Sequence, residues 1–318
     1  MVRNWTAWVG LFSSPGDWSP AGTPVAGDTL YVQNGLVVMV GQTFGSAGAP
    51  TALSLIGDTA ASAPMLALFN DTLRNVNISN TPAPFSGPMA PPDYFSAKYG
   101  TVLIGGKVVN DGGTIEAARG SRVGGNNLSI AVQSGSTLVN KGTLLSGPNS
   151  QLTISGSSVE NDYRIVAEGG HVTLSAHLTG TGDAYVNNAG VGLDSRIEIN
   201  AAVDAGQTVH IGRGPLQLDQ PTSFLGQVEL PTAGALGGVF VEGLSPASWD
   251  VKGNLLELFD GVGGRIDTLR FTTPETQASL AVYERPDATY GNTVLVSSSN
   301  FFPPPSGTTV VPYHTTTV

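Results

Sequence analysis

The sequence predicts an all-β protein in which short strands wind into a parallel β-helix, or β-solenoid, closed by a cap at each end. Segments of alternating apolar and polar residues recur along the whole chain, which is the period of a β-strand. Gly, Asn, Asp, Ser and Pro separate these segments every few residues. A Val-Asn motif also recurs, at intervals that match the length of one coil of a solenoid. No segment combines helical spacing of apolar residues with helix caps.

The composition excludes several classes of partner. The chain has 318 residues, of which 12% are charged and 42 are glycine, and its formal net charge is -10. A negative protein does not neutralise phosphates, so we expect no nucleic-acid partner. The absence of cysteine rules out disulfides and thiolate metal sites. Neither a signal peptide nor an apolar run long enough to span a membrane is recognisable, so we expect no transmembrane segment.

Residues 1–50 are expected to form an N-terminal cap followed by the first strands. They contain Trp5, Trp8 and Trp18, three of the four tryptophans of the chain. The first coil of a solenoid exposes an apolar surface and a strand edge, and an aromatic cap would cover both.

Residues 51–235 are expected to form the solenoid, with a Pro-rich loop protruding near residues 80–95. The repeats "VNDGGTIEAARG", "VNKGTLLSG" and "VENDYRIVAEG" follow one another here. The asparagines of this motif and its later echo are separated by 30, 21 and 26 residues; they are Asn110, Asn140, Asn161 and Asn187. Asn suits a corner because it tolerates the left-handed conformation and can hydrogen-bond an identical Asn in the next coil. We therefore predict a ladder of these four residues.

The C-terminal part loses the Asn-Gly repeat. Residues 236–300 keep alternating strands, which predicts an antiparallel cap, and "NLLELFDG" at 254–261 is the nearest helix candidate, although it reads equally well as a strand. Residues 301–318 form a Pro/Thr-rich tail whose β-prone residues Val310, Val311, Tyr313 and Val318 are candidates for assembly. This tail is either disordered or available to pair with a neighbour's sheet edge.

The chain resembles bacterial secreted parallel β-helix proteins of the autotransporter and filamentous-haemagglutinin-like repeat type. The segments that carry the resemblance include "GDWSPAGTPVAGDTLYV", "VVNDGGTIEA", "LVNKGTLLSG", "LTGTGDAYVNNAG" and "LLELFDGVGGRIDTLRF", and they span most of residues 15–275. The resemblance implies a right-handed β-helix at the bacterial cell surface that serves as adhesin, biofilm matrix or fibre material. Export would then proceed without a recognisable N-terminal signal peptide.

No conventional catalytic motif occurs in the sequence. Glu160, Asp162 and Glu168 form the one dense acidic cluster of the predicted coils, with Arg164 between them. Glycoside hydrolysis needs two carboxylates about 5 to 10 Å apart, so these three are the candidates for a catalytic role. A solvated, partly ion-paired surface explains them more simply.

A metal site has little support in the sequence. His171 and His177 would lie about 20 Å apart along one strand and could not share an ion. Calcium at a loop carboxylate is possible, but no motif supports it, and we expect no cofactor.

Two functions remain open at this point. The first is a non-enzymatic extracellular structural protein, a subunit that self-associates into a homo-oligomer or filament through its ends and tail. The alternative is a polysaccharide-active or polysaccharide-binding β-helix, such as a lyase, a glycosidase or a tailspike-like protein. The chain could also be a module of a larger adhesin.

Overall fold

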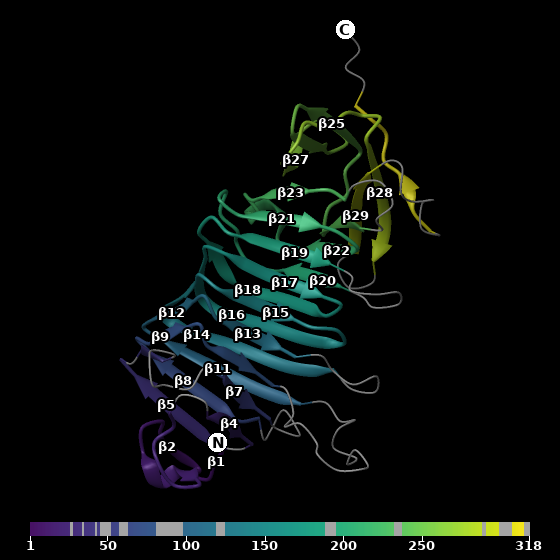
Figure 1. Cartoon of the computed structure of the whole chain (residues 1–318). Helices are drawn as coiled ribbons and strands as arrows, with labels where there is room; N and C mark the ends of the chain where they lie inside the picture. Colours follow the sequence, from purple (N-terminus) through teal and green to yellow (C-terminus); the bar gives the residue numbers. More distant parts are fainter. Residues whose placement is uncertain are drawn as a thin grey trace.

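The computed structural model describes residues 1–25, 28–33, 35–41, 43–44, 52–56, 63–80, 98–118, 125–187, 195–231, 237–287, 291–298 and 307–314. Within these residues the protein is all-β, with two long sheets of mainly parallel strands and no α-helix (Figure 1). The expected all-β class is therefore confirmed. Residues 254–261, the nearest helix candidate, contain strand β26 (Leu255–Phe259).

The described strands divide between a 14-stranded sheet, here called sheet A, and a 16-stranded sheet, here called sheet B. In sheet order, sheet A comprises β25 (Ser248–Lys252), β26, β27 (Arg265–Phe271), β23 (Gln227–Glu229), β21 (Thr208–Ile211), β19 (Asp183–Asn187), β17 (Arg164–Glu168), β15 (Thr143–Ser146), β13 (Thr114–Ala117), β10 (Asn77–Ser79), β7 (Ala52–Leu55), β4 (Thr29–Val32), β1 (Val2–Trp5) and β3 (Trp18–Ser19).

Sheet B has one main path and a short branch. The main path comprises β2 (Val9–Leu11), β5 (Leu36–Val40), β8 (Met65–Phe69), β11 (Tyr99–Gly105), β14 (Asn126–Asn140), β16 (Ser150–Asn161), β18 (His171–Thr179), β20 (Arg196–Ile199), β22 (Gly214–Leu218), β24 (Gly237–Glu242), β29 (Gly291–Ser298), β28 (Leu280–Asp287) and β30 (Thr309–Val310). The branch is β6 (Thr43–Phe44), β9 (Thr72–Arg74) and β12 (Lys107–Asp111), and β12 joins it to β14. Two 3-10 turns, η1 (Pro15–Asp17) and η4 (Pro221–Ser223), complete the described elements.

The chain alternates between the two sheets in its central part. From β15 to β23, each strand of sheet A pairs in parallel with the strand two numbers before it. The register stacks like on like, so the inward positions of sheet A form the row Ile115, Leu144, Ile165, Ala184, Val209 and Val228, all almost completely buried. One core cluster runs through both sheets. Alternation along each strand therefore buries one face in this core and leaves the other face outward.

The long strands β14 and β16 bend at irregularities in their pairing. The register of this pair shifts between Val132 and Thr137, and Gly156 lies opposite with φ of 105°. A Cβ at Gly156 would lie 1.9 Å from the carbonyl oxygen of Val132. Glycine is required here because the backbone of one strand approaches the backbone of the next too closely for a side chain.

Aromatic side chains pack at the N-terminal end of the core. Trp18 contacts Trp5 and Phe12 edge to face, with ring centroids 5.1 and 5.5 Å apart, and Phe12 contacts Phe44 in the same way. Trp8, which the sequence assigned to the same cap, is instead 78% exposed. It precedes β2, the edge strand of sheet B, beyond which the described part of the sheet has no further strand.

The C-terminal end changes from parallel to antiparallel pairing. β24 pairs in parallel with β22 and antiparallel with β29, while β25, β26 and β27 form an antiparallel meander. Antiparallel strands at this end agree with the sequence expectation for residues 236–300.

The described part of the tail packs on its own chain. β30 pairs antiparallel with β28, Val311 is buried, and Tyr313 forms a bridge with Trp249. The proposed free assembly tail is corrected accordingly, because Val310, Val311 and Tyr313 already have partners within the molecule. Val318 and nearly all of the Pro-rich segment near 80–95 lie outside the described residues.

Candidate functional site

Three of the four predicted asparagines form a hydrogen-bonded ladder inside the molecule. Asn110, Asn140 and Asn161 are register partners on β12, β14 and β16, and all three are completely buried. The Asn110 Nδ2 donates to the Asn140 Oδ1 at 2.8 Å, and the Asn140 Nδ2 donates to the Asn161 Oδ1 at 2.8 Å. Each amide donates to the next, which satisfies the Oδ1 of Asn140 and of Asn161, whereas the Oδ1 of Asn110 at the start of the ladder has no hydrogen-bond partner among the described residues.

Glycines that follow the ladder allow consecutive passages of the chain to approach closely. A Cβ at Gly142 would lie 2.2 Å from the Gly113 carbonyl oxygen, and one at Gly182 would lie 2.6 Å from the Tyr163 backbone nitrogen. The backbone nitrogen of Thr143 donates to that same Gly113 oxygen at 2.8 Å. The recurring Asn-Gly pattern thus has two physical causes: an inward amide for the ladder and a bare backbone beside it.

The ladder departs from expectation at its far end. Thr179 is the register partner of Glu160, so Gly180 follows at the place where the next ladder residue would stand. Gln207 fills the gap, since its Oε1 accepts from the Asn161 Nδ2 at 2.9 Å and its Nε2 donates to the Thr179 oxygen at 2.8 Å. Asn187 is not a ladder residue, because it lies exposed at the end of β19 in sheet A.

The ladder asparagines also do not use the left-handed conformation that we expected of them. The described non-glycine residues with positive φ are Asn70, Asn75 and Asn149. The ladder members are strand residues, so Asn is required there for its amide and not for its backbone freedom.

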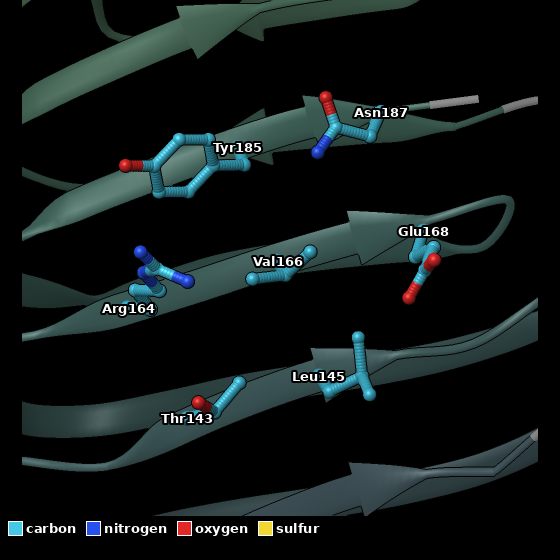
Figure 2. Close-up of a pocket in the computed structure, with 7 residues that line it drawn as sticks. All are labelled: Thr143, Leu145, Arg164, Val166, Glu168, Tyr185 and Asn187. Atoms are coloured by element: carbon cyan, nitrogen blue, oxygen red, sulfur yellow. The ribbon is translucent and has the colours of Figure 1, made fainter. Parts of the chain in front are cut away.

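A groove lies on the outward face of sheet A (Figure 2). It has a volume of about 340 Å³ and is lined by residues of three neighbouring strands: Thr143, Leu145, Arg164, Val166, Glu168, Tyr185 and Asn187. Arg164, Tyr185 and Thr143 lie at one end, and Glu168 and Asn187 lie at the other, as Figure 2 shows. Leu145 and Val166 are register partners and form an apolar floor between the two ends.

The first end of the groove combines a cation with aromatic rings. The Arg164 guanidinium carbon lies 5.0 Å from the centroid of the Tyr163 ring and 5.5 Å from that of Tyr185. On the adjacent strand, the His210 ring stacks on Tyr185 with centroids 4.5 Å apart and planes inclined by 8°. These contacts hold the Tyr185 ring between a guanidinium and an imidazole.

Carboxylates fix the aromatic rings from the side. The Asp183 carboxylate accepts from the Tyr185 hydroxyl at 3.2 Å and lies 3.2 Å from the His210 Nε2. Glu229 binds the other ring nitrogen of His210. Burial raises the pKa of the Tyr185 phenol, and the charge of Asp183 raises it further.

The second end of the groove is acidic. Burial raises the pKa of Glu116, two strands away from β17, and repulsion by the Glu168 carboxylate adds to this effect. Glu168 is exposed, and Asn187 is its register partner on β19. This end therefore offers hydrogen-bond acceptors and one amide to anything lying on the floor.

The predicted acidic cluster does not come together. Glu160 lies on β16 in sheet B, Asp162 lies in the turn after it, and Glu168 lies at the far end of β17 in sheet A. The chain changes sheets between the first and the last, and Arg164 to Glu168 spans about 13 Å of strand. An arrangement that brings Glu168 to Glu160 is therefore corrected, while a role for the neighbouring pair Glu160 and Asp162 stays a prediction.

The histidines considered for metal binding stay apart as well. His177 pairs with Asp204 at 2.9 Å, and His171 is the first residue of the same strand, six positions before His177. Within the described part of the chain, no group of three His, Asp or Glu side chains is arranged to hold a metal ion.

Sequence comparisons assign no relative to this chain. No protein-family model matches it, and no curated protein is significantly similar to it. Among the described residues there is no helix with the length and apolar character needed to cross a bilayer. The functional argument therefore rests on the geometry of the ladder, the groove and the two ends.

Proposed function

We propose that this protein is a right-handed β-solenoid that serves as a non-enzymatic structural subunit at the bacterial cell surface, in a fibre, matrix or adhesin. The observation that carries the proposal is the amide ladder through Asn110, Asn140 and Asn161, because it stacks successive passages of the chain in one register. Such a stack makes a stiff body from local contacts and has no need of a cofactor.

The N-terminal end supplies a surface for association with a second copy. β2 is the edge strand of sheet B, and Trp8, Val9 and Leu11 are 78%, 58% and 53% exposed there. An apolar edge strand with unpaired backbone groups is a template for pairing with another chain. The opposite end of the molecule carries the antiparallel meander and β30. We therefore expect two copies to associate through their N-terminal edges, since the same surface on both copies makes a symmetric interface.

Light scattering of the purified chain tests this proposal. The double variant Val9→Lys, Leu11→Lys places two positive charges on the edge strand and should convert oligomers to monomers. Dilution of the unaltered protein should also shift it from oligomer to monomer. Val262→Lys is the matched control, because Val262 is 93% exposed at the other end of the molecule. An unchanged oligomer in the double variant, or a monomer in the unaltered protein, would reject association through this edge.

A second candidate function is polysaccharide binding. The groove on sheet A favours it, since an apolar floor flanked by a cation, aromatic rings and hydrogen-bonding groups suits a sugar ring with its hydroxyls. A hydrolytic version has less support, because Glu168 lies on a strand of sheet A and Glu160 on a strand of sheet B.

A further inference from the structure

Arg164 is positioned beside a carboxylate with which it does not pair. Its register partner on β19 is the acidic residue Asp183. Asp183 is engaged by the Tyr185 hydroxyl and by His210, both at 3.2 Å. Among the described residues, Arg164 has no ion pair, and its guanidinium lies over two tyrosine rings. The groove therefore holds an exposed cation whose natural partner is already occupied.

We propose that the groove binds an oligosaccharide that contains a uronic acid, with the sugar carboxylate paired to Arg164. A guanidinium binds a carboxylate through two parallel hydrogen bonds, which fixes the orientation of the sugar. The guanidinium lies over the rings of Tyr163 and Tyr185, and Figure 2 shows it beside Tyr185 at one end of the groove. This inference deepens the polysaccharide-binding candidate and rests on it.

The remainder of the groove suits the uncharged part of such a ligand. Leu145 and Val166 form a floor for the apolar face of a sugar ring. Glu168 and Asn187 lie beyond that floor and can accept hydrogen bonds from hydroxyl groups. Arg164 and Glu168 are four residues apart on one strand, or about 13 Å, so the cation and the acceptors contact different parts of the ligand.

The same arrangement selects against two other ligands. A chain with a carboxylate on every sugar would bring one beside Glu168, whose charge already raises the pKa of Glu116. The net charge of -10 further disfavours a dense polyanion. An acidic peptide would supply the carboxylate but few hydroxyl donors for Glu168. The groove therefore favours a saccharide in which uronic acids alternate with neutral sugars.

Calorimetric titration of the full chain provides the test. The probes are hyaluronan tetrasaccharide, which alternates uronate with a neutral sugar, oligogalacturonate, cellotetraose and an oligoglutamate peptide. We expect the first to bind most tightly. Arg164→Gln should weaken it by about tenfold or more, a loss of roughly 1.4 kcal/mol or more. Arg270→Gln is the matched control on the same sheet, since it removes the same charge four strands away and should leave binding unchanged.

The outcomes separate this inference from the function on which it rests. Binding of cellotetraose as tight as that of the uronate probe would keep polysaccharide binding and overturn the role of Arg164. Equal binding of the peptide would overturn recognition of a sugar. Binding that survives Arg164→Gln overturns the assigned carboxylate contact, and failure of every saccharide to bind overturns both the inference and the polysaccharide-binding candidate. Oligomers measured by light scattering are independent of all these results.

Discussion

The central stack and the C-terminal end of the molecule are held together by different chemistry. In the stack, neutral amides bond to neutral amides and aliphatic residues of neighbouring strands lie in register. At the C-terminal end, Glu257 is bound by Lys252 at 2.7 Å and by Arg265 at 3.0 Å. Hydrogen bonds from these two cations lower the pKa of Glu257, with Lys252 the larger cause, while burial opposes the shift.

Aromatic contacts add to this difference. The Trp249 and Tyr313 rings meet edge to face, the Trp249 Nε1 donates to the Val311 oxygen at 2.9 Å, and the Tyr313 hydroxyl donates to Asp250 at 2.6 Å. A stack of parallel strands needs the same few contacts at every step, because each strand supplies the edge for the next. At an end of the molecule, no further strand covers the last edge strand, so individual side chains must cover it instead.

The largest expected effect is the loss of a central ladder residue. Asn140→Ala removes the acceptor for the Asn110 amide and the donor to Asn161, and both partners are completely buried. The Asn161 Oδ1 then loses its donor, whereas the Asn110 Nδ2 keeps its bond to the Gly113 carbonyl oxygen at 3.3 Å. The lost hydrogen bonds and a small cavity should lower the free energy of unfolding by about 3–5 kcal/mol. Urea unfolding measures it. Asn187→Ala is the control and should cost less than about 0.5 kcal/mol, because Asn187 is exposed; equal effects would contradict the ladder.

Asp267 at the C-terminal end provides the next test and should act in the opposite direction. Its side chain is 8% exposed, its Oδ2 has no hydrogen-bond partner, and burial raises its pKa from 3.8 to about 6. Because the folded protein binds this proton more tightly than the unfolded chain, its contribution to stability is greatest below pH 3.8 and is lost as the pH rises through about 6.

Replacing Asp267 should therefore stabilise the protein at neutral pH. We expect Asp267→Asn to raise the free energy of unfolding at pH 7 by up to about 3 kcal/mol and to flatten its decline between pH 4 and pH 7. Unfolding titrations across this range check both effects. Asp162→Asn, a change at an exposed turn, serves as the control. A variant that is less stable than the parent at pH 7 would show that the carboxylate is favourably bound.

A smaller effect is expected where the tail joins the C-terminal end. Tyr313→Phe removes the hydrogen bond to Asp250 and keeps the ring contact with Trp249. The expected cost is about 1–2 kcal/mol, since the acceptor is charged but the site is only partly buried. Hydrogen exchange should quicken at Val311, whose amide donates to Val282 at 3.0 Å. If exchange there is unchanged, the tyrosine hydroxyl does not hold the tail in place.

Part of this organisation could be predicted from the sequence. The ladder was accessible because Asn110, Asn140 and Asn161 belong to visibly similar repeats, and similar repeats in a stack meet in register. Gln207 was missed because Gly180 stands at the next ladder position, and the Asn161 amide is reached instead by a longer side chain from a later segment of the chain. The spacing of the repeats in the sequence does not indicate this contact between Gln207 and Asn161.

The groove could not be predicted, because it depends on register between repeats that look unlike one another. Arg164, Tyr185 and His210 lie on three different strands. Nothing in their local sequence indicates that the Arg164 guanidinium and the His210 ring both contact the Tyr185 ring. Glu160 and Glu168 are close in sequence, but the turn between them changes the sheet. Trp8 was misplaced for a related reason, since composition predicts an aromatic cap and not which ring faces inward.

Disulfide trapping tests the central claim, in-register parallel stacking, most directly. The chain has no cysteine, and Thr153 on β16 and Thr173 on β18 are outward-facing register partners. Their Cα atoms should lie about 5 Å apart, within the range of a disulfide. The double change Thr153→Cys and Thr173→Cys should form an intramolecular bond under mild oxidation. Thr153→Cys with Glu198→Cys, one strand further away, should not; the reverse result would contradict the stacked register.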